Sequence, residues 1–373
     1  MPTPPFPMPY SAVRHLSCLL LLATGTALAS EEAPPTSAVS DGPHVFLQDG
    51  RTEAAWVCDG QVERLTLDTS TVPARCGYPH PLTLVPAAEE APASVPGSRR
   101  IVALSDIHGQ YALMVRLLRA HGVIDAQDRW AMGDATLVVA GDVVDRGEQV
   151  TEAFWLLYAL QQQAAQAGGA VHFVLGNHET MVLYDDLRYV NPKYLQVAGL
   201  LQRSYPQLYA ADSVIGQWLR SRPVLLRVGD TLFLHGGIGP EALELALDAA
   251  TTNARYRASL GTPKATVKAD PALAPLYDGK TSPIWYRGYF DGRLDTAAVA
   301  ALVEKLGVAR IVVGHTSMAH VSRFHDGRVI AIDSSIKKGE SGELLFIEDG
   351  QLSRGLLDGR RVPLAEGMSA GNE

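Results

Sequence analysis

The sequence predicts an α/β fold built of mixed sheets. After Arg100, short runs of β-branched and other apolar residues alternate with helical patterns, as expected for strands covered by helices. Two of these runs, 101–104 and 137–140, break into glycine and aspartate within a few residues of the strand end. Near the end of the chain, Asp-Gly pairs at 326–327 and 349–350 favour tight turns, so we expect antiparallel strands to close the domain.

The first 29 residues have the pattern of a secretory signal peptide. Arg14 and His15 precede an apolar run at 16–23, and the small residues of 27–29 form a cleavage pattern. The apolar run is too short to span a bilayer. We therefore expect cleavage, no stable membrane insertion afterwards, and a periplasmic or secreted protein. An uncleaved membrane tether is the alternative.

Composition favours a globular enzyme over a nucleic-acid-binding protein. Apolar residues make up 47% of the 373 residues, which is enough to bury a substantial core. The formal net charge is −8, and removal of Arg14 with the signal would make it −9. An acidic surface repels a phosphate backbone, so nucleic acid is not an expected partner. A small phosphorylated group held by a few local arginines remains compatible with this charge.

Residues 30–99 are predicted to be a leader, a small β module and a linker. The leader is rich in Glu, Pro, Ser and Ala, and the linker at 85–99 contains three prolines. Between them, Asp-Gly pairs at 49–50 and 59–60 separate short strand-like runs and predict hairpin turns. The runs are 44–47, 55–58 and 63–67.

Two cysteines remain once the signal segment has removed Cys18. Cys58 and Cys76 are 18 positions apart, and in an oxidising compartment they most simply form one disulfide. Closing such a loop would stabilise the module by about 3 kcal/mol. Neither cysteine sits in a paired-cysteine motif, which disfavours a zinc site. Two buried free thiols are the remaining alternative.

We expect the catalytic domain to span 100–360, with 361–373 as a C-terminal tail. Helices are predicted at 110–120, 149–167 and 294–306; the last begins after Asp295 and ends before Gly307, which are suitable capping residues. A helical excursion at 180–222 would form a lid or wall beside a site. A second insertion, 242–282, is broken by prolines and receives no assignment.

Chemically reactive side chains follow three of the predicted strands. Asp106 and His108 follow the first strand, Asp142 follows the second, and Asn177 and His178 follow the third at 171–175. Ligand sites in α/β sheets lie at the carboxyl edge of the strands, so these side chains are candidates for one shared site. Taken singly, such an aspartate could cap a helix and such a histidine could be an ordinary core residue.

Five short blocks in this order resemble the motifs of the calcineurin-like metallophosphoesterases. The blocks are Asp106-x-His108, Gly141-Asp142-x-x-Asp145-Arg146-Gly147, Gly176-Asn177-His178-Glu179, His235-Gly236-Gly237 and Gly314-His315. The second and third look like the phosphoprotein phosphatase branch. The signal segment and the motif 285–288 make the chain most similar to the bacterial Shewanella-like protein phosphatases. The resemblance covers 100–350 and implies an αββα sandwich of mixed sheets.

The resemblance also implies a pair of divalent ions, Mn²⁺ first, with Fe or Zn²⁺ as alternatives. Asp142 would be shared between the two ions. Asp106 and His108 would complete the first site. The second would be completed by Asn177, His235 and His315. Two such ions can hold a water, lower its pKa towards neutrality and promote in-line attack at phosphorus.

Four further residues are assigned roles by the same resemblance. His178 would be the general acid, oriented and kept protonated by Asp145. Arg146 and Arg287 would bind the non-bridging phosphate oxygens, a task that suits their planar guanidinium groups. The chain departs from the wider family at Ser317, where many members have a further histidine, so the first ion should be rich in water ligands. The phosphoprotein phosphatase branch's inhibitor-contacting loop is also not found, which puts sensitivity to its toxins in doubt.

The predicted function is that of a metal-dependent phosphatase acting on a phosphorylated protein, at Tyr or Ser/Thr, or on a small phosphomonoester. A bis(5'-nucleosyl)-tetraphosphatase has similar motifs and is the alternative enzyme; Glu179 favours the phosphatase, because we expect Asp there in the polyphosphate hydrolases. A non-catalytic protein that binds metal or phosphate is the alternative from another class. Asp145 and His178 argue against it, since recognition alone needs no positioned acid.

Overall fold

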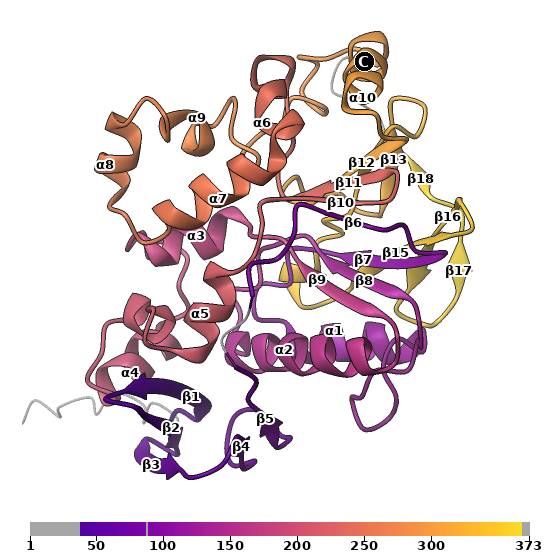
Figure 1. The fold of residues 1–373 in the computed structure, drawn as a ribbon. Coiled ribbons are helices and arrows are strands. Elements are labelled where there is room, and N and C mark those ends of the chain that lie inside the picture. Colours follow the sequence, from indigo (N-terminus) through magenta and orange to yellow (C-terminus); the bar gives the residue numbers. More distant parts are fainter. Residues whose placement is uncertain (1–37, 87–88, 368–373) are drawn as a thin grey trace, which may run out of the picture. The chain divides into compact units, whose positions relative to one another are not determined.

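The computed structural model describes residues 38–86 and 89–367. Its core consists of two mixed sheets packed face to face, with helices on the outer face of each (Figure 1). This arrangement confirms the predicted αββα sandwich. The expected signal peptide, 1–29, lies outside the described residues.

The six-stranded sheet carries the first three of the five sequence blocks. Its strand order is β17-β16-β15-β7-β8-β9. The three strands β7, β8 and β9 are parallel, and β15 pairs with β7 in the antiparallel direction. The connections between the parallel strands are helices α1 and α2, as expected for crossovers. The bounds are β7 Arg100–Leu104, α1 Tyr111–Ala120, β8 Thr136–Val139, α2 Val150–Gln166, β9 Ala170–Phe173, β15 Glu343–Glu348, β16 Gln351–Leu356 and β17 Arg361–Val362.

The seven-stranded sheet carries the remaining two blocks. Its order is β18-β13-β14-β12-β11-β10-β6, with β11, β12 and β14 parallel and β10 antiparallel to β11. Helix α10 precedes β12. As predicted, Asp295 caps it by accepting a bond from the backbone N–H of Ala298 at 2.7 Å, and Gly307 ends it with φ 61°. The bounds are β6 Ser94–Val95, β10 Leu225–Val228, β11 Thr231–Leu234, α10 Thr296–Leu306, β12 Arg310–Val313, β13 Ser322–Phe324, β14 Val329–Ala331 and β18 Ala365–Glu366.

The period-two pattern of the strands divides the core into two layers. In β7, Ile101 and Ala103 face the other sheet, whereas Val102 and Leu104 join the larger cluster that includes α1 and α2. Because all four are buried, β7 reads as an uninterrupted apolar run in the sequence. Burial on both faces holds the strand ends, and the loops that follow them, in fixed positions.

The N-terminal module contains a three-stranded antiparallel sheet, with the order β1-β2-β3. A disulfide links Cys58 and Cys76, as predicted, with their Cα atoms 5.6 Å apart. The module contacts α2, where Trp155 Nε1 donates a hydrogen bond to Pro43 O at 2.7 Å. The bounds are β1 Asp41–Gln48, β2 Arg51–Cys58, β3 Gln61–Leu67, β4 Thr71–Val72 and β5 Leu82–Thr83.

Two segments that the sequence set apart belong to the sheets. Strand β6 lies in the expected linker and pairs with β10. Strands β17 and β18 lie in the expected C-terminal tail and pair with β16 and β13. Each is only two residues long, which is too short for a periodic pattern to be visible in the sequence.

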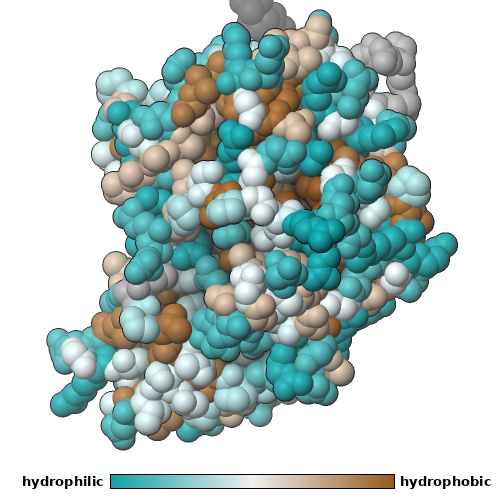
Figure 2. Space-filling model, turned by 45° about the vertical axis from the view of Figure 1, so that its right-hand side comes forward, coloured by the Kyte–Doolittle hydropathy of each residue, from teal (hydrophilic) through white to brown (hydrophobic). Residues whose placement is uncertain are grey.

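Both insertions are helical. The first contains the expected helical wall, and the second, which received no assignment, forms short helices separated by prolines. Their bounds are α3 Asn177–Leu183, α4 Pro192–Leu200, η1 Tyr205–Tyr209, α5 Val214–Arg220, η2 Pro240–Ala242, α6 Leu243–Leu247, α7 Ala249–Ser259, α8 Lys264–Ala269 and α9 Ala274–Tyr277, and a last short helix, η3 Ile336–Lys338, follows β14. Within the described residues, no helix has the length and apolarity needed to cross a membrane. The face drawn in Figure 2 is mainly hydrophilic, with smaller hydrophobic patches.

Candidate active site

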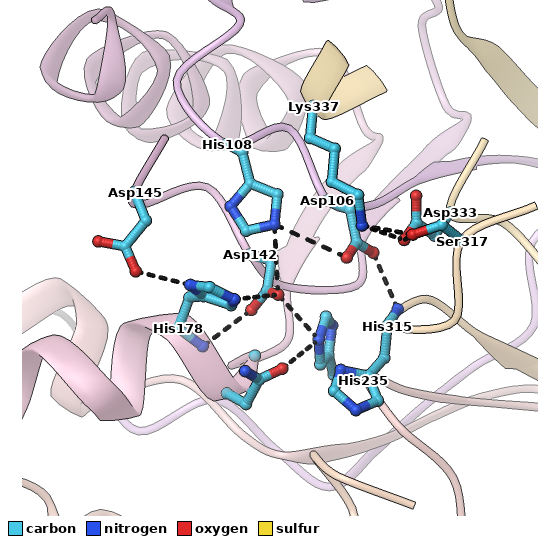
Figure 3. Close-up of polar contacts among 12 residues, drawn as sticks. Asp106, His108, Asp142, Asp145, His178, His235, His315, Ser317, Asp333 and Lys337 are labelled. Carbon is cyan, nitrogen blue, oxygen red and sulfur yellow. Dashed lines mark hydrogen bonds and ion pairs between the residues drawn. The ribbon is translucent and has the colours of Figure 1, made fainter. Parts of the chain in front are cut away.

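The structure brings the six predicted ligand residues to one place, at the ends of five strands. Figure 3 shows the two aspartates and three histidines among them. Asp142 lies at the centre. Its Oδ2 atom is 3.1 Å from Nε2 of His235 and 3.6 Å from Nε2 of His108. The Nε2 atom of His178 is 3.8 Å away. One buried carboxylate thus faces three imidazoles that come from three different segments of the chain, with His178 in the first turn of α3.

Two groups of possible metal ligands share Asp142. The ligand atoms of His108, Asp142 and His178 lie within 4.8 Å of one another, and so do those of Asp142, His235 and His315. Asn177 adds its Oδ1 atom, 2.9 Å from Nε2 of His235. The carboxylate and imidazole donors, without thiolates, suit Mn²⁺, Fe or Zn²⁺.

Asp106 extends the first group. Its Oδ1 atom is 3.9 Å from Nε2 of His108, and its Oδ2 atom accepts a hydrogen bond from the backbone N–H of His315 at 2.9 Å. The sequence placed Asp106 in the first ion site and reserved His178 for acid catalysis. In the structure His178 also points into this site, so the environment of each histidine must distinguish the two roles.

The second ring nitrogen of each histidine makes that distinction. Nδ1 of His108 donates to the carbonyl of Val144, and Nδ1 of His235 donates to the carbonyl of Ala140, both at 2.7 Å. Such bonds fix the tautomer that leaves Nε2 free to bind a metal. Nδ1 of His178 instead donates to the carboxylate of Asp145 at 2.6 Å. A carboxylate partner at Nδ1 orients the ring so that Nε2 points into the site, which is the geometry that a proton donor requires.

The electrostatics of the site indicate a demand for positive charge. Burial and the nearby Asp333 carboxylate raise the pKa of Asp106 well above its usual range. Burial opposes protonation of His235, but the Asp142 carboxylate outweighs burial and raises the pKa of His235 to about 9. Both shifts favour a bound proton, on the Asp106 carboxyl group and on His235 beside the Asp142 carboxylate. A metal cation would supply positive charge to the same two carboxylates.

The remaining two histidines are suited to act as neutral ligands. Burial lowers the pKa of His108 well below its usual range, and burial and His235 do the same for His315. Nε2 of His315 is buried and has no hydrogen-bond partner among the described residues. A buried imidazole nitrogen without a partner is costly unless a ligand satisfies it. The donor set therefore fits a pair of divalent ions.

Backbone strain is concentrated at this site. Six of the predicted site residues have positive φ angles between 47° and 72°. Positive φ is uncommon for residues other than glycine and is retained when the surrounding structure holds it. These residues are Asp106, His108, Asp142, Asp145, Arg146 and His315. The strained turns direct side chains from consecutive loop positions towards one point.

Glu179 holds the Asp142 loop, a role that sequence reasoning missed. Its buried carboxylate accepts hydrogen bonds from the backbone N–H groups of Asp142, Val143 and Gly176 at 3.0, 2.7 and 2.9 Å. Gly176 has to be a glycine, because a Cβ there would collide with the Asp142 carboxylate. The block 176–179 thus positions the loop after β8 in addition to supplying Asn177 and His178.

A second cluster that sequence reasoning missed lies beside Asp106. Asp333 follows β14 and is fully buried, and its Oδ2 atom accepts a hydrogen bond from Ser317 Oγ at 2.7 Å. Lys337 approaches both residues and lies 3.2 Å from Asp333 Oδ2 (Figure 3). Ser317 therefore belongs to a polar network where many family members have a histidine. Asp333 follows the pattern of a strand ending in a carboxylate and could have been found by it.

The two predicted phosphate-binding arginines lie at the edge of the site. Arg287 donates from Nη1 to the carbonyl of His315 at 2.8 Å and to Thr316 Oγ1 at 3.1 Å. Arg146 is exposed, and its guanidinium carbon lies 4.9 Å from the centre of the Tyr189 ring. Neither guanidinium group makes a further hydrogen bond to a described residue, so both can donate hydrogen bonds to a ligand.

Tyr189 is a further residue that sequence reasoning missed. It comes from the first insertion and is 41% exposed. Its ring centre is 5.1 Å from that of His178. Its carbonyl accepts a hydrogen bond from the Arg146 backbone N–H at 2.9 Å, which ties the insertion to the loop after β8.

The calcineurin-like phosphoesterase family model matches residues 99–318, which is more than half of the chain. This chain belongs to that family. The phosphoesterase is also similar to a solved structure, a cold-active protein-tyrosine phosphatase of a psychrophilic Shewanella species. The two are 42% identical with a TM-score of 0.84 over 87% of this chain and 99% of the other.

Two curated relatives carry the names of the two enzyme classes predicted above, a protein phosphatase and a bis(5'-nucleosyl)-tetraphosphatase. Shewanella-like protein phosphatase 2 of Arabidopsis thaliana is 29% identical over 291 residues, 64% of this chain and 72% of the relative. A symmetrical bis(5'-nucleosyl)-tetraphosphatase of Chromobacterium violaceum is 30% identical over 283 residues, 68% of this chain and 93% of the relative. The predicted likeness to the Shewanella-like phosphatases is confirmed, as is the prediction of a metal-dependent hydrolase of phosphate esters.

Proposed function

We propose that this phosphoesterase is a two-metal phosphatase that hydrolyses phosphomonoesters, with phosphotyrosine in proteins as its preferred substrate. The observation that carries the proposal is the position of Asp142 between two groups of ligand atoms, beside a histidine paired with a buried carboxylate. Two divalent ions, when bound, polarise the phosphoryl group and activate water for in-line attack. We assign them to Asp106, His108, Asp142, Asn177, His235 and His315, with Mn²⁺ as the first choice.

His178 is the proton donor in this proposal. Its Nε2 atom faces the site, and its Nδ1 atom is held by Asp145. The leaving oxygen of a phosphomonoester takes a proton as its bond to phosphorus breaks, and a positioned imidazolium typically accelerates such a step by about 10²- to 10⁴-fold. Arg146 and Arg287 bind the non-bridging oxygens, where charge accumulates during transfer.

The aryl preference is supported by Tyr189. Because its ring lies against His178, a leaving group that receives the proton from His178 would lie alongside it. Offset or edge-to-face contact between two aromatic rings contributes roughly 0.5–1.5 kcal/mol beyond the burial of area. The similar Shewanella structure, at 42% identity, is described as a protein-tyrosine phosphatase. We also propose a periplasmic or secreted location, since the Cys58–Cys76 disulfide suits an oxidising compartment.

Metal reconstitution tests the proposal. The mature protein would be stripped with a chelator, supplied with Mn²⁺, Fe²⁺ or Zn²⁺ separately, and assayed on p-nitrophenyl phosphate, phosphotyrosine peptides, phosphoserine peptides and diadenosine tetraphosphate. We expect metal-dependent hydrolysis of the first two substrates, with the highest kcat/KM on phosphotyrosine peptides.

Two outcomes would overturn it. Preferred cleavage of diadenosine tetraphosphate would place this chain with the polyphosphate hydrolases, to which the Chromobacterium violaceum relative belongs by name. Stoichiometric metal binding without turnover of any of these substrates would favour a binding protein.

A further inference from the structure

A small cavity with basic and aromatic walls lies beside the proposed active site. Its volume is about 170 Å³. It is lined by Tyr184, Lys264, Lys268, Tyr277, Gly279 and Trp285. Tyr184 follows α3, the second insertion supplies four of the lining residues, with both lysines in α8, and Trp285 follows that insertion. The cavity contains no residue of the five sequence blocks and none that was assigned a role above, although Trp285 begins the motif 285–288.

One aromatic side chain separates the cavity from the metal-binding residues. Trp285 lines the cavity, and its ring centre lies 5.5 Å from that of His315 in an edge-on arrangement. Tyr184 lies at the C-terminal end of α3, the helix that begins with Asn177 and His178. Trp285 and helix α3 therefore lie next to both the cavity and the phosphate site, which are close neighbours.

Positive charge exceeds negative charge at the cavity. Lys264 lies 3.0 Å from Asp186 Oδ2, but Arg188 already binds the same carboxylate with two donors, at 2.7 and 2.9 Å. Lys268 is exposed and forms no ion pair with any described residue. Lys264 and Arg188 thus share one carboxylate and Lys268 adds a further positive charge, in a protein whose net charge is −8.

The aromatic walls strengthen the attraction of these lysines for an anion. Tyr277 is 8% exposed, and Tyr184 and Trp285 are half-buried, so they reduce the access of water to one side of the cavity. Charge pairs interact more strongly where water is partly excluded. At roughly 30 Å³ per water molecule in the liquid, the volume has room for a carboxylate side chain or a phosphoryl group.

We propose that this cavity is a subsite for an anionic side chain of the phosphorylated substrate, located one to three residues from the phosphorylated residue. This inference rests on the proposed phosphatase function. An extended peptide advances about 3.3 Å per residue, and a single ring separates the cavity from His315, so a nearby side chain spans the gap. The anion is the carboxylate of Asp or Glu, or a second phosphoryl group. The cavity thereby selects acidic or doubly phosphorylated sequences.

Peptide pairs test the subsite. Phosphotyrosine peptides with Glu, phosphoserine or Ala at each of the three positions on either side would be compared by kcat/KM with the metal-loaded full-length enzyme. We expect a preference of about five- to tenfold for an anionic residue over Ala at one or two of these positions, weakening as salt is raised. The Glu and phosphoserine peptides distinguish the two sources of the anion.

The lysine variants connect the preference to the cavity. Lys268→Gln should reduce it towards one, and Lys268→Glu should reverse it in favour of a peptide that carries Lys. Lys268 has no ion-pair partner among the described residues, so its loss should not disturb folding; the double variant Lys264→Gln/Lys268→Gln would be checked by thermal unfolding. The matched control is Lys280→Gln, because Lys280 is exposed, belongs to the same insertion and does not line the cavity.

The possible failures are distinguishable. Equal kcat/KM for the Glu, phosphoserine and Ala peptides, or a preference that survives in Lys268→Glu, would overturn the subsite. Either result is compatible with a phosphatase as long as wild-type enzyme hydrolyses p-nitrophenyl phosphate. Failure to hydrolyse p-nitrophenyl phosphate or any phosphotyrosine peptide would overturn the proposed function itself.

Discussion

Nδ1 of His178 lies 2.6 Å from Oδ2 of Asp145, whereas the Nδ1 atoms of His108 and His235 face backbone carbonyls. Asp145 is fully buried, and its other oxygen has no hydrogen-bond partner among the described residues. Burial raises the pKa of Asp145, and the hydrogen bond from His178 opposes that rise. Among the described residues, the Asp145 carboxylate therefore forms a hydrogen bond only with the imidazole of His178. This pairing separates the proposed acid from the proposed ligands.

The first prediction concerns this pair. His178→Asn should retain both metal ions but lose turnover by about 10²- to 10⁴-fold on alkyl phosphates, whose leaving groups need a proton. The loss on p-nitrophenyl phosphate should be much smaller, because nitrophenolate leaves without one. Asp145→Asn should show the same pattern in a weaker form. Metal content by elemental analysis, together with kcat on both substrates, checks the prediction. A variant that loses metal would show that His178 is a ligand, as its position 3.8 Å from Asp142 also allows.

The second prediction concerns Tyr189. Replacing it with Ala should lower kcat/KM on phosphotyrosine peptides by about three- to tenfold, which corresponds to the energy of one aromatic contact, and change phosphoserine peptides little. Tyr189→Phe should restore the wild-type ratio, because the ring is retained. Steady-state kinetics on both peptides provides the measurement. An equal fall on both would assign Tyr189 to holding His178 and Arg146 in place, without a role in selecting the substrate.

The sequence predicted that most of these side chains would converge, because the relevant pattern is local. A buried strand that ends in a carboxylate or histidine can be recognised within a few residues, as at Asp106 and Asp142. The carboxyl ends of parallel strands meet at one edge, which explains why distant blocks converge. The pattern of a buried strand followed by a carboxylate also occurs at Asp333, which lies outside the motifs and follows β14.

Other features depend on tertiary contacts that leave no local pattern. The four-residue block of Glu179 carries no sign that its carboxylate holds a loop more than thirty positions earlier in the chain. Tyr189 and Lys268 lie in insertions whose helices are short, so periodicity gives little information there. Strand β6 consists of two residues and is defined only by its pairing with β10. These parts are determined by what packs against them.

The third prediction concerns Glu179. Glu179→Gln exchanges a carboxylate that accepts from several backbone N–H groups for an amide with one acceptor oxygen, so some of those donors lose their partner. Each unsatisfied buried donor costs about 1–3 kcal/mol, so the free energy of unfolding should fall by a similar amount. The affinity for metal should fall with it, because the Asp142 loop is no longer held. Chemical denaturation and metal titration check both effects. Wild-type metal affinity in a destabilised variant would restrict Glu179 to a structural role.

The last prediction concerns Glu152, which is buried in α2 where the N-terminal module contacts the catalytic domain. Burial and the Asp41 carboxylate raise the pKa of Glu152 from 4.5 to about 7, and Lys193 opposes this only partly from 4.0 Å. The folded protein therefore binds this proton more tightly than the unfolded chain, so the stabilising contribution is present below pH 4.5 and is lost as the pH rises to about 7. Glu152→Gln should increase the free energy of unfolding at pH 8 by up to about 3 kcal/mol, at about 1.4 kcal/mol per pKa unit, and change it little at pH 4.

Urea denaturation at several pH values gives the measurement, with the exposed neighbour Glu148→Gln as the control. If Glu152→Gln is instead less stable than wild type at pH 8, the carboxylate is ionised there and its pairing with Lys193 outweighs the cost of burial.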